Sequence, residues 1–268
     1  MSKSIFITGA SSGLGKAAAR LFQSKGWNVI ATMRQPEKET ELRQLKNITI
    51  LPLDVTNGQQ VNDTVEQVAN LYDIDVVLNN AGYGLIGPLE AFSEEQINKQ
   101  VDTNLLGVIR VSKAFIPWFR EKRKGLFLNI TSSFGLLGFP TCTLYSATKF
   151  AVDGFSEALA LELAQFDVRV KIVAPGGIRT DFAGRSLQSG THGAYRQLMA
   201  KVAEGYSAEQ VANYASAEDI ARVIFEAATD GQDKLRYVAG KDAIALYHER
   251  TATGAEAQLE RLKSAFLF

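Results

Sequence analysis

Residues 4–25 constrain the fold of this chain more than any other segment. Residues 5–8 predict a short apolar strand, residues 9–15 form a glycine-rich turn, and residues 16–25 carry apolar side chains at helical spacing. Glycines let the backbone turn tightly and approach a ligand, and free N–H groups at a helix start attract an anion. The pattern indicates a pyrophosphate site, although such a turn can also join a strand to a helix without a ligand. Its spacing is G-x-x-x-G-x-G rather than the common G-x-G-x-x-G.

The next strand, predicted for residues 28–32, completes a βαβ unit of about 30 residues. Proteins that prefer NAD carry an acidic residue at the end of this strand, where it binds the ribose hydroxyls. Here Met33 and Arg34 occupy that place, so no carboxylate repels a 2′-phosphate and Arg34 can pair with one. The sequence therefore favours NADP(H), with NAD(H) still open. The alternative is a solvated arginine at a strand end.

Strands and helices alternate along most of the chain. This alternation predicts a Rossmann-type, doubly wound α/β fold, with a mostly parallel seven-stranded sheet and helices on both faces, in one domain over residues 1–268. The further strands are expected at 48–53, 74–78, 125–130, 168–174 and 235–239. The further helices are expected at 37–45, 57–71, 93–120 with a bend allowed at Gly107, 143–165, 216–229 and 255–265.

Two segments fall outside this alternation. Residues 180–214 are rich in loops and glycine, with a short helix expected at 194–202, and they predict an insertion that acts as a substrate lid. Residues 241–268 form a C-terminal extension whose apolar tail, 266–268, is expected to pack on this or a neighbouring subunit.

Composition excludes several classes of protein. Lys+Arg and Asp+Glu number 29 each, so the chain lacks the positive charge expected of a nucleic-acid binder. No run of ~18 apolar residues predicts a membrane span, and the apolar run at the N-terminus is too short for a signal peptide. The single Cys142 cannot form an intrachain disulfide, so a cytoplasmic location is expected.

Tyr145 and Lys149 are four residues apart in a predicted helix and therefore share one face. A lysine charge at that distance should lower the pKa of the tyrosine, which would make the phenol a useful acid or base near neutral pH. Ser132 follows the strand at 125–130 and precedes Tyr145 by thirteen residues, so its hydroxyl can reach the same substrate oxygen. A chance pair on a helix surface is the alternative.

Asparagines mark two further positions. Asn79 and Asn80 begin a polar turn of small residues that runs to Gly82 at a strand carboxyl end, where open parallel sheets bind ligands. Asn104 falls in the middle of a helix, where its side chain competes for backbone hydrogen bonds. Asn104 is therefore either an ordinary surface residue or one with a structural or site role.

Taken together, these motifs resemble the short-chain dehydrogenase/reductase family in its shorter single-domain form, over about residues 3–240. The motifs are Thr8-Gly9-x-x-x-Gly13-x-Gly15, Asp54-Val55, Asn79-Asn80-Ala81-Gly82, Asn104, Ser132, Tyr145-x-x-x-Lys149, and Pro175-Gly176 with Thr180.

The resemblance implies four catalytic roles. Tyr145 would be the general acid/base at the substrate oxygen, and Lys149 would lower its pKa and hold the nicotinamide ribose hydroxyls. Ser132 would orient the carbonyl or alcohol, and Asn104 would position a water that relays protons from Lys149 to solvent. The hydroxyls that flank Ser132 are alternatives, but the family's thirteen-residue offset to Tyr145 favours Ser132.

The resemblance also implies which residues hold the cofactor. Ser12, in the glycine turn, is uncharged where NADP-preferring members often carry a basic residue, so the NADP preference rests mainly on Arg34. The implied cofactor residues, from the pyrophosphate through the adenosine to the nicotinamide, are Gly9, Ser11, Ser12, Gly13, Leu14 and Gly15; Arg34, Asp54, Val55, Asn80, Ala81 and Gly82; and Tyr145, Lys149, Pro175, Gly176, Ile178 and Thr180.

The sequence thus predicts an NADP(H)-dependent oxidoreductase that interconverts a carbonyl and an alcohol. No metal is expected, because His192 and His248 are far apart and no Cys/His cluster exists. The alternatives are an epimerase or dehydratase on the same fold, or a non-catalytic NADP(H)-binding regulator. Helices at 104–120 and 146–165 resemble those that pair subunits in the family, so a homodimer or homotetramer is expected.

The substrate is predicted to be apolar or aromatic. The alternative is that several of the side chains behind this prediction belong to the core or an interface. These side chains are Phe134, Leu136, Leu137, Phe139, Phe182 and Leu187.

Overall fold

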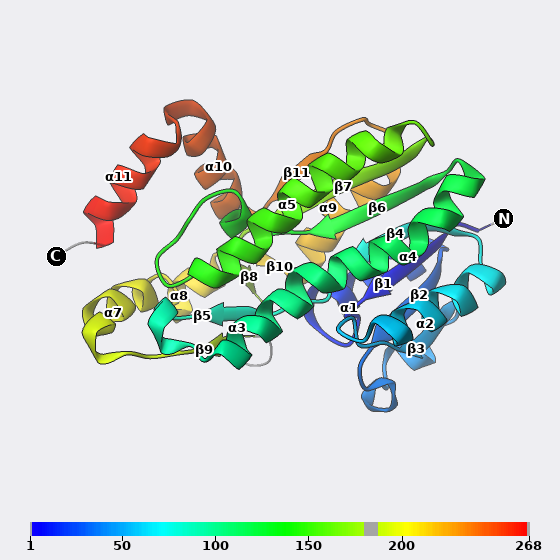
Figure 1. Ribbon diagram of the computed structural model, residues 1–268, viewed down its shortest axis with the longest axis horizontal. Helices are drawn as coiled ribbons and strands as arrows, with labels where there is room; N and C mark the ends of the chain where they lie inside the picture. Colours follow the sequence, from blue (N-terminus) through cyan, green and yellow to red (C-terminus); the bar gives the residue numbers. More distant parts are fainter. Residues whose placement is uncertain (1, 180–186, 267–268) are drawn as a thin grey trace.

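The computed structural model describes residues 2–179 and 187–266, and it contains the predicted central sheet. Seven parallel strands lie in the order β11-β7-β6-β4-β1-β2-β3 (Figure 1). The strands are β1 (Ser4–Thr8), β2 (Asn28–Met33), β3 (Ile48–Pro52), β4 (Ile74–Asn79), β6 (Gly125–Ile130), β7 (Val168–Pro175) and β11 (Arg236–Ala239).

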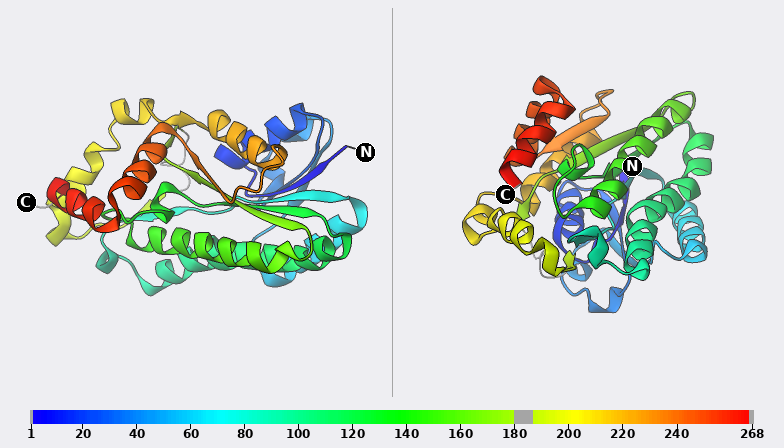
Figure 2. Two further views of the ribbon diagram at one scale, coloured as in Figure 1. Left: turned by 90° about the horizontal axis from the view of Figure 1, so that it is seen from above. Right: turned by 60° about the vertical axis from the view of Figure 1, so that its left-hand side comes forward.

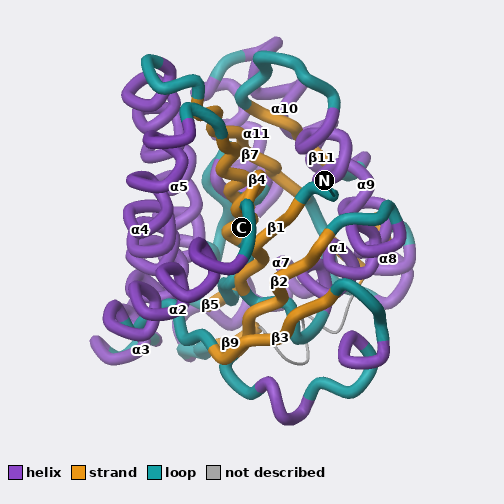
Figure 3. The backbone as a smooth tube through the Cα atoms, turned by 90° about the vertical axis from the view of Figure 1, so that its right-hand side faces the viewer, coloured by secondary structure: helices purple, strands orange, loops and turns teal. Residues whose placement is uncertain are grey.

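Helices cover both faces of this sheet, as predicted. Helices α1 (Gly13–Ser24) and α9 (Ala217–Thr229) pack together on one face. Helices α2 (Gly58–Leu71), α4 (Gly107–Lys122) and α5 (Thr143–Ala164) cover the other (Figure 3). Because both faces are covered, the inner strands β1, β4, β6 and β7 are largely buried, whereas the edge strand β3 is only partly buried.

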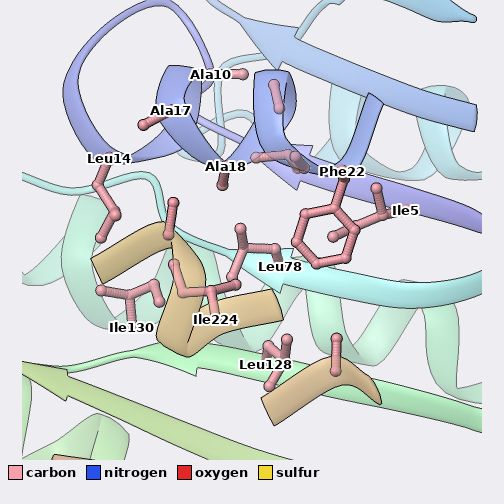
Figure 4. Close-up of a cluster of buried hydrophobic side chains, with 14 of the residues drawn as sticks. Ile5, Ala10, Leu14, Ala17, Ala18, Phe22, Leu78, Leu128, Ile130 and Ile224 are labelled. Carbon is pink, nitrogen blue, oxygen red and sulfur yellow. The ribbon is translucent and has the colours of Figure 1, made fainter. Parts of the chain in front are cut away.

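Two apolar layers hold the helices to the sheet. In the layer under α1 and α9, Phe22 and Ile224 meet Ile5, Leu78 and Leu128 from the strands (Figure 4). The opposite layer contains Phe6, Phe115, Phe119 and Phe127. Burial of each large side chain stabilises the fold by about 1.5–3 kcal/mol.

The strand order places a crevice at the carboxyl ends of β1 and β4. The chain runs outward from β1 through β2 to β3, then returns to β4 on the other side of β1 and continues outward to β11. The connections after β1 and β4 therefore diverge to opposite faces. This reversal is the point at which open parallel sheets bind ligands.

The helix expected at 37–45 is absent, and that prediction is wrong. Two short 3₁₀ turns, Pro36–Lys38 and Leu42–Gln44, occupy the segment. The buried Glu39 carboxylate accepts hydrogen bonds from the amides of Glu41 (2.8 Å) and Leu42 (2.9 Å), and it pairs with Lys16 (3.2 Å). The Glu39 carboxylate thus accepts hydrogen bonds from backbone amides that a continuous helix would pair with backbone carbonyls.

The helix expected at 93–120 is divided. Helix α3 (Glu94–Val101) starts at a Ser93 capping box, a π-helical turn follows over Asp102–Leu106, and α4 continues the helix. Gly107 is required for packing, since a Cβ there would lie 2.7 Å from Val55 Cγ2. The irregularity therefore falls on the turn that contains Asn104, just before Gly107.

Short elements surround the carboxyl edge of the sheet. Strand β5 (Gly84–Ile86) pairs with β9 (Leu187–Ser189), and β8 (Ile178–Arg179) pairs with β10 (Ala215–Ser216). Helices α7 (Arg196–Glu204) and α8 (Ala208–Ala212) follow β9; α7 begins two residues later than expected. The chain ends in α10 (Lys241–Thr253) and α11 (Ala255–Phe266). Among the described helices, none has the length and apolar character needed to cross a bilayer.

Candidate active site

A cleft of about 1730 Å³ opens at the carboxyl ends of the strands. Its wall contains almost every site residue predicted from the sequence. Asn104 lies behind this wall, and Thr180 lies outside the described residues. The predicted residues on the wall are Gly9, Ser11, Ser12, Gly13, Leu14, Gly15, Arg34, Asp54, Val55, Asn80, Ala81, Gly82, Ser132, Tyr145, Lys149, Pro175, Gly176 and Ile178.

The glycine turn packs directly against the turn after β4. Gly9 has φ +69°, and a Cβ there would lie 2.9 Å from Ala81 Cα. A Cβ at Gly15 would overlap the Gly9 carbonyl oxygen. The Asn80 side chain donates to the carbonyls of Thr8 and Gly9, each at 3.0 Å. Glycine is therefore needed at these positions for the two turns to touch.

The start of α1 is suited to an anion. Gly13 has φ +51°, and a Cβ there would meet no atom within 4 Å, so this part of the turn faces open space. The Ser12 side chain makes no capping hydrogen bond to the first turn of the helix. Free amide groups and the helix dipole thus remain for a ligand. These features fit the pyrophosphate of a dinucleotide.

At the end of β2, Met33 and Arg34 line the cleft, as do Asp54 and Val55 after the neighbouring strand β3. Arg34 is exposed, and within residues 2–179 and 187–266 its guanidinium has no ion-pair or hydrogen-bond partner. The nearby cation Lys16 is instead held by Glu39 (3.2 Å) and Glu41 (3.0 Å). Arg34 is therefore available to a phosphate, whereas Lys16 is already paired.

Ser132, Tyr145 and Lys149 converge at the nicotinamide end predicted from the sequence. Ser132 follows β6, and its Oγ accepts from the Phe134 amide at 3.2 Å. The first two turns of α5 carry Tyr145 and Lys149. The Lys149 side chain is 6% exposed, and its Nζ donates to the Ile130 carbonyl at 2.9 Å. Burial lowers the pKa of Lys149 to about 8.

The expected lowering of the Tyr145 pKa is wrong. Burial raises the pKa of Tyr145 to about 12, and the hydrogen bond with Ser132 only partly opposes this effect. The Lys149 ammonium lies 5.8 Å from the centre of the tyrosine ring and is bonded to the Ile130 carbonyl. Desolvation of the phenol therefore outweighs the attraction of the lysine charge.

Asn104 braces the backbone next to the cleft. Its side chain is 1% exposed, accepts from the Tyr83 amide at 3.0 Å and donates to the Tyr83 carbonyl at 2.8 Å. A Cβ at Gly82 would lie 3.1 Å from Asn104 Oδ1 and 3.8 Å from Lys149 Nζ, so Gly82 separates the two side chains. The proton relay from Lys149 through Asn104 stays a prediction.

The apolar side of the cleft agrees only partly with the sequence prediction. Phe134, Phe139 and Leu187 line it. Leu136 and Leu137 do not line it, so the prediction is wrong for both, and Leu137 is buried. Phe182 lies outside the described residues.

Several lining residues had no signal in the sequence. Tyr83 on the turn after β4, Asp242 and Leu246 on α10, and Phe266 on α11 all face the cleft. For Phe266 alone, the apolar tail at 266–268 indicated packing on this or a neighbouring subunit. Their place in the site follows from how distant segments pack rather than from any local motif.

Comparisons with known proteins agree with this geometry. The model of the short chain dehydrogenase family matches residues 3–189. A curated relative, 3-ketodihydrosphingosine reductase from Bacteroides thetaiotaomicron, is 42% identical over 179 residues, which cover 66% of this chain and 65% of the reductase.

Two solved structures share the fold over nearly the whole chain. A short-chain dehydrogenase from Streptomyces avermitilis has a TM-score of 0.84 at 30% identity, with 98% of this chain and 97% of that chain covered. ElxO with NADP bound has a TM-score of 0.77 at 29% identity, with coverage of 91% and 100%. The chain therefore belongs to the short-chain dehydrogenase/reductase family of oxidoreductases.

Proposed function

We propose that this protein is an NADP(H)-dependent oxidoreductase that interconverts a carbonyl and an alcohol on an apolar substrate. One observation carries the proposal: Ser132, Tyr145 and Lys149 meet in the same cleft as the glycine turn. The proposal treats the chain as one dinucleotide-binding domain, with residues 180–214 as the substrate insertion and 241–268 as an extension.

Tyr145 is the proton donor in the direction of reduction. With a pKa of about 12 its phenol is protonated at neutral pH, so it can deliver a proton to a carbonyl oxygen. Ser132 lies within hydrogen-bond reach of the phenol and holds the same oxygen. A bound nicotinamide would supply the hydride to the carbonyl carbon. The protonated phenol at neutral pH is the form that the reduction step requires.

Lys149 binds rather than reacts in this proposal. Its Nζ uses one proton on the Ile130 carbonyl, which leaves two donors for ribose hydroxyls. Its charge also attracts a polyanionic dinucleotide into a partly dehydrated cleft. Asn104 holds the Tyr83 backbone and, through it, the turn at Asn80–Gly82 that faces the cofactor.

The proposed preference for NADP(H) rests on Arg34. Arg34→Ala should raise the NADPH KM by at least tenfold while the NADH KM changes less than threefold, because only NADPH carries the 2′-phosphate. Arg120→Ala, an exposed arginine on α4 outside the cleft, is the matched control. An equal change for both cofactors would mean that Arg34 does not bind the 2′-phosphate.

The proposed substrate is a carbonyl with a large apolar body. Phe134 and Phe139 lie on the cleft wall next to Ser132. The Bacteroides relative is named for the reduction of 3-ketodihydrosphingosine, and ElxO has been solved with NADP bound. Both support the choice of cofactor and substrate class made here.

Turnover of a panel of ketones and aldehydes with NADPH tests the proposal. Tyr145→Phe should lower kcat/KM by about 10²–10⁴-fold, because the proton donor is lost. Tyr72→Phe removes a hydroxyl that bonds Thr49 outside the cleft and should leave activity within twofold. Activity of Tyr145→Phe near that of wild type would reject the mechanism.

The same assay separates the alternatives. An epimerase or dehydratase would keep its nucleotide bound, so release of NADP⁺ at each turnover argues against it. Tight NADPH binding without turnover on any carbonyl would instead support a regulator.

We also propose a homodimer or homotetramer built on α4 and α5. Leu161 is 78% exposed on α5, and Phe150 is also exposed there. A monomer in light scattering would contradict this assembly. The cytoplasmic location stays a prediction.

A further inference from the structure

The C-terminal helices form a hairpin at the open end of the cleft. Helices α10 and α11 meet at Gly254, which has φ +89°, and α11 lies beside α7 (Figures 1 and 2). Leu246 of α10 and Phe266 of α11 both line the cleft. A segment about 100 residues beyond the catalytic tyrosine in the chain thus forms part of the wall.

The root of the hairpin is fixed on the turn after β7. The Asp242 carboxylate accepts from the Gly177 amide at 2.7 Å, and Ala243 is fully buried. A Cβ at Gly176 would overlap the same carboxylate. Because Pro175 and Gly176 line the cleft, the hairpin is anchored to the cofactor-facing turn.

The two helices are also held to each other. Gln258 of α11 is fully buried, and its Nε2 donates to the Leu246 carbonyl (2.9 Å) and to Glu249 Oε2 (3.1 Å). Arg261 pairs with the same Glu249 carboxylate at 2.7 Å. These hydrogen bonds link Leu246, which lines the cleft, to α11, so the two helices are held together as one unit.

The C-terminal end of α11 meets the loop after β6 through aromatic rings. Phe266 packs edge-to-face on Phe139, with ring centres 5.3 Å apart, and Phe139 stacks on Phe134 at 4.8 Å. The Phe134 amide in turn donates to Ser132 Oγ. Phe134, Phe139 and Phe266, called here the aromatic row, therefore run from the catalytic serine to the C-terminal helix.

We propose that Phe266 is a specificity-determining residue, and that a carbonyl substrate lays a flat or extended apolar body along the aromatic row. The inference rests on the proposed function and deepens it. Aromatic rings bury large apolar areas with little loss of side-chain freedom, so a row of three favours long substrates over short ones. Phe266, at the far end of the row, contacts only the distal part of such a body.

The test compares a series of methyl ketones, from 2-butanone to 2-dodecanone, with NADPH. In the wild-type protein kcat/KM should rise by about fourfold for each added methylene until the row is covered. Phe266→Ala should lower kcat/KM for 2-dodecanone at least tenfold and leave 2-butanone and the NADPH Kd within twofold. Leu259→Ala is the matched control, because Leu259 lies on the same helix and is 49% exposed.

A binding assay keeps this inference separate from the proposed function. Displacement of 1-anilinonaphthalene-8-sulfonate by 2-dodecanone needs no turnover, and Phe266→Ala should weaken it at least fivefold. If the wild type reduces no ketone but this binding difference is seen, the proposed function fails and the role of Phe266 stands. If Phe266→Ala binds or turns over long ketones as wild type does, or matches Leu259→Ala, the inference is overturned.

Discussion

Two buried lysines in this protein differ in what satisfies their charge. Lys149 lies on α5 at the carboxyl end of the sheet and is 6% exposed. Lys171 lies within β7 and is 2% exposed. Removing either ammonium from water is costly unless the protein replaces the lost hydrogen bonds.

Only Lys171 has this replacement in full. Its Nζ donates to the Ala227 carbonyl (2.9 Å), Asp230 Oδ1 (2.7 Å) and the Tyr237 hydroxyl (3.0 Å), which uses all three protons. In the part of the chain that the structure describes, Lys149 Nζ has one acceptor, the Ile130 carbonyl, and no carboxylate partner.

The pKa values of Lys149 and of Asp230, the ion-pair partner of Lys171, follow from this difference. Burial lowers the pKa of Lys149 to about 8. Burial would raise the pKa of Asp230, but hydrogen bonds from Lys171 and Tyr237 outweigh it and hold that pKa at about 2. Burial alone therefore does not mark a lysine as a site residue, and unused donors are what distinguish Lys149 from Lys171.

The largest expected effect is on activity. Lys149→Met should lower kcat/KM for carbonyl reduction by about 10²–10⁴-fold, because two charge-assisted hydrogen bonds to the cofactor ribose are lost, at roughly 1.5–3 kcal/mol each. Its melting temperature should stay the same or rise, because a poorly satisfied buried charge is replaced by an apolar chain of similar length. Steady-state assays and thermal melts check both, and kcat/KM within tenfold of wild type would remove Lys149 from the mechanism.

The next effect is on stability. Lys171→Met leaves the Asp230 carboxylate and the Tyr237 hydroxyl without their cation and should cost about 3 kcal/mol in urea unfolding. At 25 °C its kcat/KM should remain within twofold of wild type. Lys234→Met is the control, since Lys234 is exposed over the same Tyr237 ring and should cost less than ~0.5 kcal/mol. Equal stability of the two variants would refute the structural role of Lys171.

A smaller effect is expected when the NADPH Kd is measured as a function of pH. The pKa of Lys149 is lowered from its ordinary value, so the ammonium is charged at pH 7 and loses its proton as pH rises through about 8. The NADPH Kd should therefore rise about tenfold between pH 7 and 9.5, the size of a lost charge-assisted hydrogen bond. Fluorescence titrations measure it, and Lys149→Gln should give a flat profile. Parallel profiles in the two proteins would exclude Lys149 as the titrating group.

The smallest effect is expected in acid. The Asp230 pKa is depressed in the folded state, so its stabilisation is present above the ordinary aspartate pKa and is lost as pH falls through about 2. The difference in unfolding free energy between wild type and Asp230→Asn should therefore shrink from pH 4.5 to pH 2.5. A constant difference over this range would mean that the charge of Asp230 contributes nothing.

The sequence predicted the sheet and most of the residues that line the cleft because both depend on local patterns. The strands contain apolar runs such as Ile5–Ile7 and Val76–Leu78, and Gly9 and Gly15 lie where a Cβ would collide with neighbouring backbone. Helix capping is also local, so the capping residues Asn57 and Ser93 correctly predicted where α2 and α3 begin.

The errors concern features that depend on distant partners. Residues 37–45 failed as a helix because Glu39 is buried against Lys16. Helix α10 was missed because its alanines form no apolar stripe and only Ala243 is buried. The Tyr145 pKa moved opposite to expectation because burial outweighs the lysine charge. None of these tertiary contacts can be inferred from the spacing of residues along the sequence.

The most direct test of the account is the rise in melting temperature that saturating NADPH causes in wild type, Lys149→Met and Lys171→Met. Lys171→Met should melt at a lower temperature than wild type but gain as much from NADPH as wild type does. Lys149→Met should melt like wild type and gain less, by about 2–4 °C for each tenfold loss of affinity. An undiminished gain in Lys149→Met would contradict the claim that this lysine's unused donors serve the cofactor.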